Sequence, residues 1–93
     1  MKFKLEQLDG RHSGHRIYTH RVWIHGTGVD RKRDYVQARE WCWETFGPGC
    51  ERDLVWYNNS SSYSWAFHYD IRQESVYIYL KKELLTAFLL RWS

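Results

Sequence analysis

The order of hydrophobic and polar residues changes its period at the C-terminal end of the chain. Residues 76–80 alternate between aliphatic and tyrosine side chains, which predicts a strand. After Lys81-Lys82-Glu83 the spacing becomes three and four, and this predicts an amphipathic helix whose apolar stripe is Leu84, Leu85, Phe88, Leu89 and Trp92. A strand therefore leads into a helix, and we expect the stripe to pack on the sheet.

Two further strands are predicted at the N-terminal end. Met1–Leu8 alternates apolar with charged residues, and Asp9-Gly10 and Arg11–His15 read as exposed turns that lead into a strand over Arg16–His25. The period of two divides that second strand between two faces. One face carries Tyr18, His20, Val22 and Ile24, and the other carries Ile17, Thr19, Arg21 and Trp23.

A helix is predicted over Arg31–Phe46. Asp30 is placed to cap its first turn, and Gly47-Pro48 gives it a well-defined end. Its inward stripe is Tyr35, Ala38, Cys42 and Phe46.

The middle of the chain predicts a second hairpin. Leu54–Tyr57 reads as a short strand, Asn58–Ser62 as a polar turn, and Tyr63–Tyr69 as the return strand. One face of the return strand is wholly aromatic, with Tyr63, Trp65, Phe67 and Tyr69, while the other carries Ser64, Ala66 and His68. We expect the aromatic face to be buried under the helix at Lys82–Arg91.

These elements predict one domain over residues 1–93. The expected fold is α+β: a two-layer sandwich with a mainly antiparallel sheet of four or five strands. The helices at Arg31–Phe46 and Lys82–Arg91 should cover one face of that sheet.

Composition adds two features to this picture. Aromatic residues make up 18% of the chain and include six Trp. Either several of these rings lie at the surface, where they suit binding, or the small core is filled with large side chains. The net charge is +3, and most of the basic residues precede Asp34. No apolar run is long enough for a membrane span, and we expect a soluble, intracellular protein.

No catalytic or metal-binding pattern stands out. Cys42 lies in the predicted apolar stripe, Cys50 lies in a loop, and the spacing of the cysteines and histidines differs from that of zinc sites. Glu40 and Glu44 lie one helical turn apart, on what should be a solvated face. We therefore expect no metal, no cofactor and no enzymatic activity.

Two segments carry a resemblance. Residues 39–49 (REWCWETFGPG) and 77–92 (YIYLKKELLTAFLLRW) resemble a pattern in small, mostly uncharacterised proteins of tailed bacteriophages. In that pattern a Trp-rich helix ends in Phe-Gly-Pro, and a C-terminal strand and helix end near Leu-Arg-Trp. The resemblance implies a phage protein in the host cytoplasm that binds and inhibits a host protein or defence complex, or a minor component of the virion.

Two classes of function remain open from the sequence. The first is a non-enzymatic interaction protein that binds a host protein through exposed aromatic and arginine anchors. Its candidate residues are Arg21, Trp23, Trp56 and Tyr57. The second is a module for single-stranded nucleic acid, with bases stacked on the aromatic strand and phosphates held by basic residues. Its candidate residues are Arg16, Arg21, Arg31, Lys32, Arg33, Trp65 and Phe67.

Overall fold

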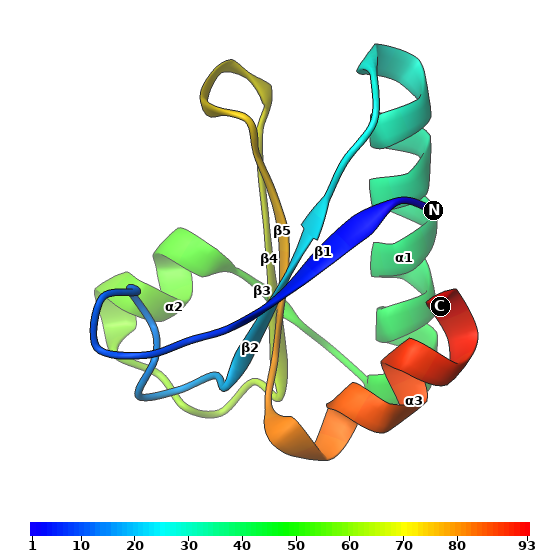
Figure 1. The fold of residues 1–93 in the computed structure, drawn as a ribbon. Coiled ribbons are helices and arrows are strands. Elements are labelled where there is room, and N and C mark those ends of the chain that lie inside the picture. The colour runs from blue at the N-terminus through cyan, green and yellow to red at the C-terminus, as the bar shows by residue number, and fades with distance from the viewer.

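The computed structural model describes all residues from 1 to 93 (Figure 1). The strands and helices, in chain order, are β1 (Phe3–Gln7), β2 (His20–Ile24), α1 (Gly28–Phe46), β3 (Cys50–Glu51), α2 (Arg52–Asn58), β4 (Trp65–Asp70), β5 (Ser75–Leu80) and α3 (Lys82–Trp92). A 3-10 turn over Ile71–Gln73 joins β4 to β5. The predicted α+β class is confirmed. None of the helices has the length and apolar character to cross a bilayer.

The strands form one five-stranded sheet in the order β1-β2-β5-β4-β3. All pairs are antiparallel except β3 with β4, which is parallel. The last strand in the chain, β5, is therefore central, with β2 on one side and β4 on the other. This is the mainly antiparallel sheet that the sequence predicts.

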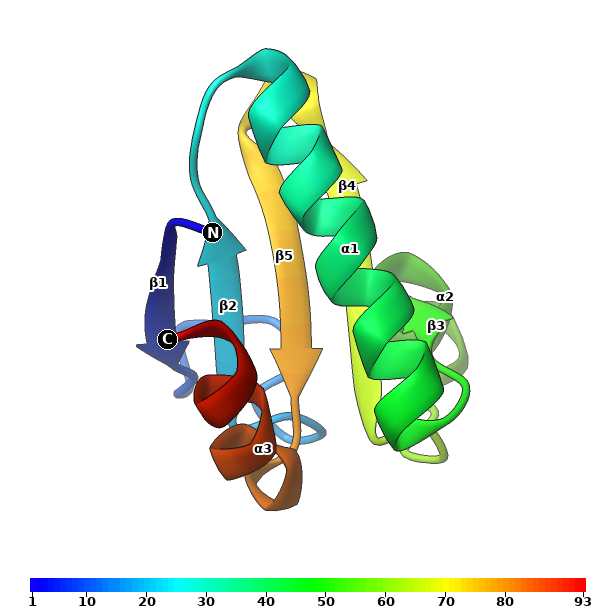
Figure 2. The same ribbon diagram turned by 90° about the vertical axis from the view of Figure 1, so that its right-hand side faces the viewer.

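Helices α1 and α3 cover the same face of the sheet, as predicted (Figure 2). The main core lies between them and the sheet. Its buried residues are Val22, Ile24, Tyr35, Ala38, Cys42, Trp65, Val76, Ile78, Leu80 and Phe88. The alternation of β2 and β5 and the stripe of α1 supply most of this set, so the period of each element determines which side chains are enclosed.

The aromatic face of β4 turns toward the helices, and Trp65 is fully buried. Its contacts come from α1 and the residues that follow it. Trp43 meets the indole edge to face at 6.2 Å, and the indole nitrogen donates to the Gly47 carbonyl at 2.8 Å. The predicted burial is confirmed for Trp65 and in part for Phe67 and Tyr69, whereas Tyr63 precedes β4 and packs against the cluster that contains Tyr18 and Tyr79. The contacts with Trp65 come from α1 and not from α3 at Lys82–Arg91.

The predicted strand at Leu54–Tyr57, and with it the second hairpin, is wrong, because these residues lie in helix α2. Glu51 caps that helix by accepting a hydrogen bond from the Asp53 amide at 2.6 Å. Asn59 closes it in the left-handed conformation, which Asn tolerates well. The partner of β4 is instead the short parallel strand β3.

Helix α2 lies on the opposite face of the sheet from α1 and α3 (Figure 1). Together with the loop that precedes β2, it encloses a second, smaller core. The buried residues of this core are Leu8, Tyr18, Val55, Ala66 and Tyr79. The molecule is therefore a two-layer sandwich with a third, partial layer on its other side.

Two sequence predictions near β2 and α1 need correction. Regular pairing in β2 begins at His20, and the amides of Ile17 and Tyr18 both donate to the Gly14 carbonyl in a turn. Tyr18 therefore enters the second core and does not share a face with Val22. Helix α1 begins at Gly28, so Asp30 lies inside its first turn and is not the cap.

Candidate binding face

The part of the sheet that α2 and the loop leave open carries a group of basic and aromatic side chains, which we call the Trp23 face. Its members are Lys4, Arg21, Trp23 and Tyr77, which occupy paired or diagonal positions on β1, β2 and β5. They alternate with core residues such as Val22 and Ile78, so they project away from α1 and α3. Figure 1 shows no helix over this part of the sheet.

Arg21 is held in the middle of the Trp23 face. Its guanidinium lies 4.2 Å from the centre of the Tyr77 ring, a cation-π contact. The same guanidinium forms an ion pair with Glu6 at 3.0 Å, and both side chains are less than one-fifth exposed. Arg21 is therefore positioned in advance of any binding event, which lowers the entropy lost when it contacts a partner.

Trp23 is fixed by contacts on several sides. Its ring centre lies 4.5 Å from that of His25 and 6.4 Å from that of Tyr77. Its indole nitrogen donates to the Glu74 carbonyl at 3.0 Å. The ring remains partly exposed, so Trp23 offers a rigid apolar surface whose polar atom already has a partner.

A polar network ties α2 to the sheet next to the Trp23 face. His68 is 8% exposed; its Nδ1 lies 2.6 Å from Glu51 and its Nε2 lies 3.1 Å from an Arg52 nitrogen. Because a guanidinium only donates, Nε2 must accept, and the Nδ1 proton is then donated to Glu51. Arg52 also donates to the Tyr79 hydroxyl at 3.3 Å and to Asp53 at 3.1 Å.

This network is the one place where the structure gathers groups of the kinds that bind metal ions. Ligand atoms of Glu51, Asp53 and His68 lie within 4.8 Å of one another. However, Arg52 bonds to both Asp53 and His68, and its positive charge opposes a second cation at that point. The arrangement suits a structural role, in which every partner in the network is a protein group.

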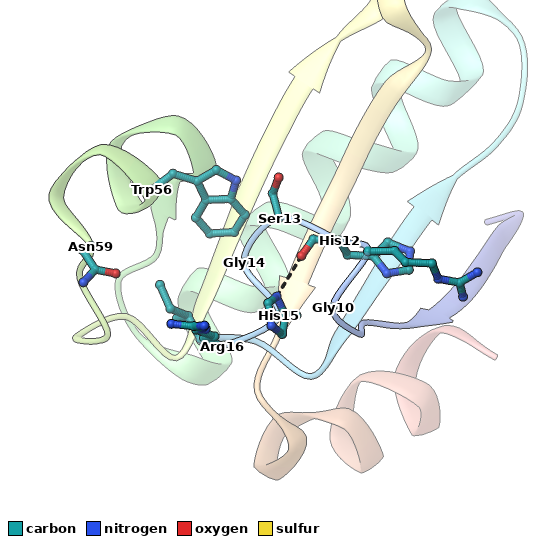
Figure 3. Close-up of a pocket in the computed structure, with 10 residues that line it drawn as sticks. Gly10, His12, Ser13, Gly14, His15, Arg16, Trp56 and Asn59 are labelled. Carbon is teal, nitrogen blue, oxygen red and sulfur yellow. Dashed lines mark hydrogen bonds between the residues drawn. The ribbon is translucent and has the colours of Figure 1, made fainter.

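A second feature on this side of the molecule is a hollow of about 380 Å³ between the loop 10–17 and α2, which we call the basic hollow (Figure 3). Its lining residues are Gly10, Arg11, His12, Ser13, Gly14, His15, Arg16, Ile17, Trp56 and Asn59. Two arginines and two histidines are among them and no acidic residue is, so the hollow favours an anionic ligand.

The two histidine rings and two arginine guanidiniums of the basic hollow differ in how available they are to a ligand. Asp9 binds the Arg11 guanidinium at 3.0 Å and the His12 ring at 3.2 Å. Hydrogen bonds from Arg11 to Asp9 hold the pKa of that carboxyl far below its ordinary value. The His15 ring meets the His12 carbonyl at 3.0 Å (Figure 3). Arg16 is exposed and has no ion pair, so it is the freest cation of the hollow.

The four residues predicted for protein binding all lie on the side of the sheet that bears α2. Arg21 and Trp23 belong together on the Trp23 face. Trp56 is only partly exposed, because it packs against Tyr18 and Tyr79 in the second core. Tyr57 is 88% exposed on α2. The structure thus brings Arg21 and Trp23 together on one face, whereas Trp56 mainly fills the second core.

The residues predicted for nucleic-acid binding do not form one track. Trp65 is fully buried and cannot stack on a base, and Phe67 also turns toward the helices, beneath Arg39. Arg31 is 6% exposed and pairs with Glu74 at 2.7 Å.

The other predicted basic residues lie on both sides of the sheet. Lys32 and Arg33 lie on α1, and Arg33 is next to Asp30 and Asp34. Arg16 and Arg21 lie on the other side of the sheet.

Sequence reasoning missed two parts of this region. Tyr77 joins Trp23 only through the pairing of β2 with β5, which links residues far apart in the chain. The contact of His68 with Glu51 and Arg52 likewise depends on α2, where the sequence analysis predicted a strand. The alternation of Tyr77 and Tyr79 with core residues is a local signal that both tyrosines face away from the main helices.

No protein-family model matches this chain, and comparison with curated proteins and with solved structures found no match.

Proposed function

We propose that this protein is a non-enzymatic binding protein that docks onto another protein through the Trp23 face. The proposal rests on the arrangement of Arg21 and Trp23 around Tyr77, in which rigid aromatic rings and a guanidinium lie together on a part of the sheet that no helix covers. Trp, Tyr and Arg are the residue types that dominate binding energy at protein interfaces.

Tyr57 on α2 is a second candidate for contact with the partner. It is 88% exposed, and Leu54, one turn earlier on the helix, is 56% exposed. Large apolar side chains at these exposures suit a contact with a partner better than contact with water. The bacteriophage resemblance supplies the class of partner: a host protein or defence complex that binding would inhibit.

The test compares capture of a partner from bacterial lysate by the unaltered protein and by three variants. Trp23→Ala and Arg21→Ala should each reduce recovery of a stoichiometric partner at least about tenfold, since anchors of this kind contribute about 2 kcal/mol or more. Trp43→Ala is the matched control, because Trp43 is 49% exposed on α1, on the other side of the sheet. Equal loss with Trp43→Ala, or no stoichiometric partner, would contradict the proposal.

Nucleic-acid binding is a second candidate function, and its site would be the basic hollow instead of the aromatic strand. The observation that favours it is that Arg16 and Trp56 line the same hollow. Arg16→Gln should weaken binding of a labelled single-stranded oligonucleotide and make the affinity less sensitive to salt, because one phosphate contact is lost. Arg33→Gln, on the other side of the sheet, should have no effect. Absence of binding at low salt would end this candidate.

A further inference from the structure

The two edges of the sheet differ in how they are protected. β3 is only two residues long and leads directly into α2, which leaves a short edge. β1 is five residues long, contains no proline, and pairs with β2 without a bulge. It has no neighbour on its other side, and Figure 2 shows it at the margin of the sheet. β1 is therefore the edge that is open to another strand.

The hydrogen bonds at the ends of β1 show which of its backbone groups point outward. The His25 amide donates to the Lys2 carbonyl, and the Leu8 amide donates to the Thr19 carbonyl. In an antiparallel pair the residues that bond to the neighbour recur at every second position, so the even-numbered residues of β1 turn their backbone groups toward β2. The residues with outward N–H and C=O groups are Phe3, Leu5 and Gln7.

Side-chain charge then selects among the ways in which two β1 strands can pair. In a pairing with two-fold symmetry, the outward backbone groups of one β1 lie opposite those of the other β1. If each strand is to pair through more than one of its outward residues, the two-fold axis must pass through Lys4, Leu5 or Glu6. Centring on Lys4 sets Lys4 against Lys4, and centring on Glu6 sets Glu6 against Glu6; like charges directly opposite are unfavourable. Centring on Leu5 sets Lys4 against Glu6 twice and pairs the whole of β1.

We propose that two copies of this chain associate through β1, antiparallel about Leu5, into one continuous sheet. Lys4 and Glu6 then occupy the closely spaced positions without direct backbone bonds, where side chains approach best. Glu6 lies between Arg21 of its own copy, at 3.0 Å, and Lys4 of the second copy. On the helix side the two Leu5 residues, each partly exposed in the single chain, cover one another.

The association is independent of the proposed protein partner, and it sets two Trp23 faces on the same side of one sheet. Its first test is the mass of the purified protein by analytical ultracentrifugation over a range of concentrations. The mass should rise from the 11.4 kDa of one chain to about twice that value. A mass that stays at 11.4 kDa up to the solubility limit would overturn the proposal.

The second test uses charge reversal. Lys4→Glu alone and Glu6→Lys alone each place like charges opposite one another, and each should raise the dissociation constant about tenfold or more. An equimolar mixture of the two variants restores both Lys–Glu pairs and should form a heterodimer. Circular dichroism should show each variant folded. Failure of the mixture to associate, with both variants folded, would overturn the proposed register.

Two further variants separate the interface from general effects of charge. Lys2→Glu makes the same change of charge outside β1, opposite Leu8 of the second copy, and should leave the dimer unchanged. Gln7→Pro removes an N–H that points outward and is not bonded to β2, so it should disrupt the dimer while the monomer folds. A dimer that survives Gln7→Pro and Lys4→Glu would show that another surface holds it.

Discussion

The indole nitrogen of Trp65 donates to the carbonyl of Gly47 at 2.8 Å, and this bond joins the sheet to the end of α1. The chain then passes so close to the same ring that a Cβ at Gly49 would collide with the indole of Trp65. Gly47 itself has a φ of 87°, in the region that favours glycine. The end of α1 is thus shaped around Trp65, which gives this ring a role in placing the helix as well as filling the core.

Trp65→Ala should lower the free energy of unfolding by about 3–5 kcal/mol, because it removes a fully buried ring and leaves a cavity. Chemical denaturation measures the effect. Trp43→Ala, at a residue that is 49% exposed, should cost about 1 kcal/mol or less. Similar denaturation midpoints for Trp65→Ala and the unaltered protein would contradict the assigned core.

Gly14→Ala should destabilise the loop that forms the basic hollow. Gly14 has a φ of 83°, and an added Cβ would collide with the ring of Trp56. The backbone strain alone should cost about 1–3 kcal/mol, measured as a lower thermal midpoint. Gly10→Ala is the control, because no atom lies within 4 Å of the Cβ position there. Equal midpoints for the two variants would contradict both the left-handed conformation of Gly14 and its contact with Trp56.

Glu51→Ala should lower the free energy of unfolding by about 1–3 kcal/mol, because Glu51 both caps α2 and accepts a hydrogen bond from His68. Glu51→Gln keeps an oxygen for the Asp53 amide and should cost less. Denaturation midpoints measure both changes. Glu44→Ala, on the exposed face of α1, should have almost no effect, and a loss equal to that of Glu51→Ala would argue against the network.

Stability should fall as the pH rises above 9, because of Cys42. Burial raises the pKa of this thiol from its ordinary value of 9.0 to about 12. Between these values the unfolded chain loses the proton that the folded chain keeps, so unfolding becomes more favourable with rising pH. Burial likewise raises the pKa of Tyr35 from 10.0 to about 12, which adds to the loss at higher pH.

Urea denaturation across this range measures the alkaline loss of stability. Cys42→Ala should flatten the change between pH 9 and 10, where the thiol titrates in the unfolded chain before the tyrosines do. An unchanged slope in Cys42→Ala would show that the thiol does not contribute.

The sequence identifies the elements whose signals are local. The end of α1 at Gly47-Pro48, the passage from β5 to α3, and the inward aromatic face of β4 all follow from spacing and turn chemistry. α2 could not be recognised in this way, since an apolar run as short as Leu54–Tyr57 fits a strand or a helix. Asn58-Asn59, interpreted as a hairpin turn, contains the residue that closes α2.

The candidate site was predictable to the same extent. Alternation along β2 places Arg21 and Trp23 on one face, and the structure does so. The neighbours of these residues depend on strand register: Tyr77 is supplied by β5, and Glu6 by β1. Such pairings join segments far apart in the chain, so no local pattern encodes them. The same non-local pairing divides Arg16 from Lys32 by placing them on opposite sides of the sheet.

The central position of β5 has a consequence for synthesis of the protein. β2 and β4 each bond to β5 and not to one another, so β1–β2 and β3–β4 remain separate pieces until residues 75–80 have left the ribosome. Closing this sheet requires contacts between residues 20–23 and 77–80, a large loop closure that slows folding. The edges of β2 and β4 that bond to β5 therefore stay unpaired until β5 has left the ribosome. Unpaired strand edges are the part of a nascent chain most prone to associate with other chains.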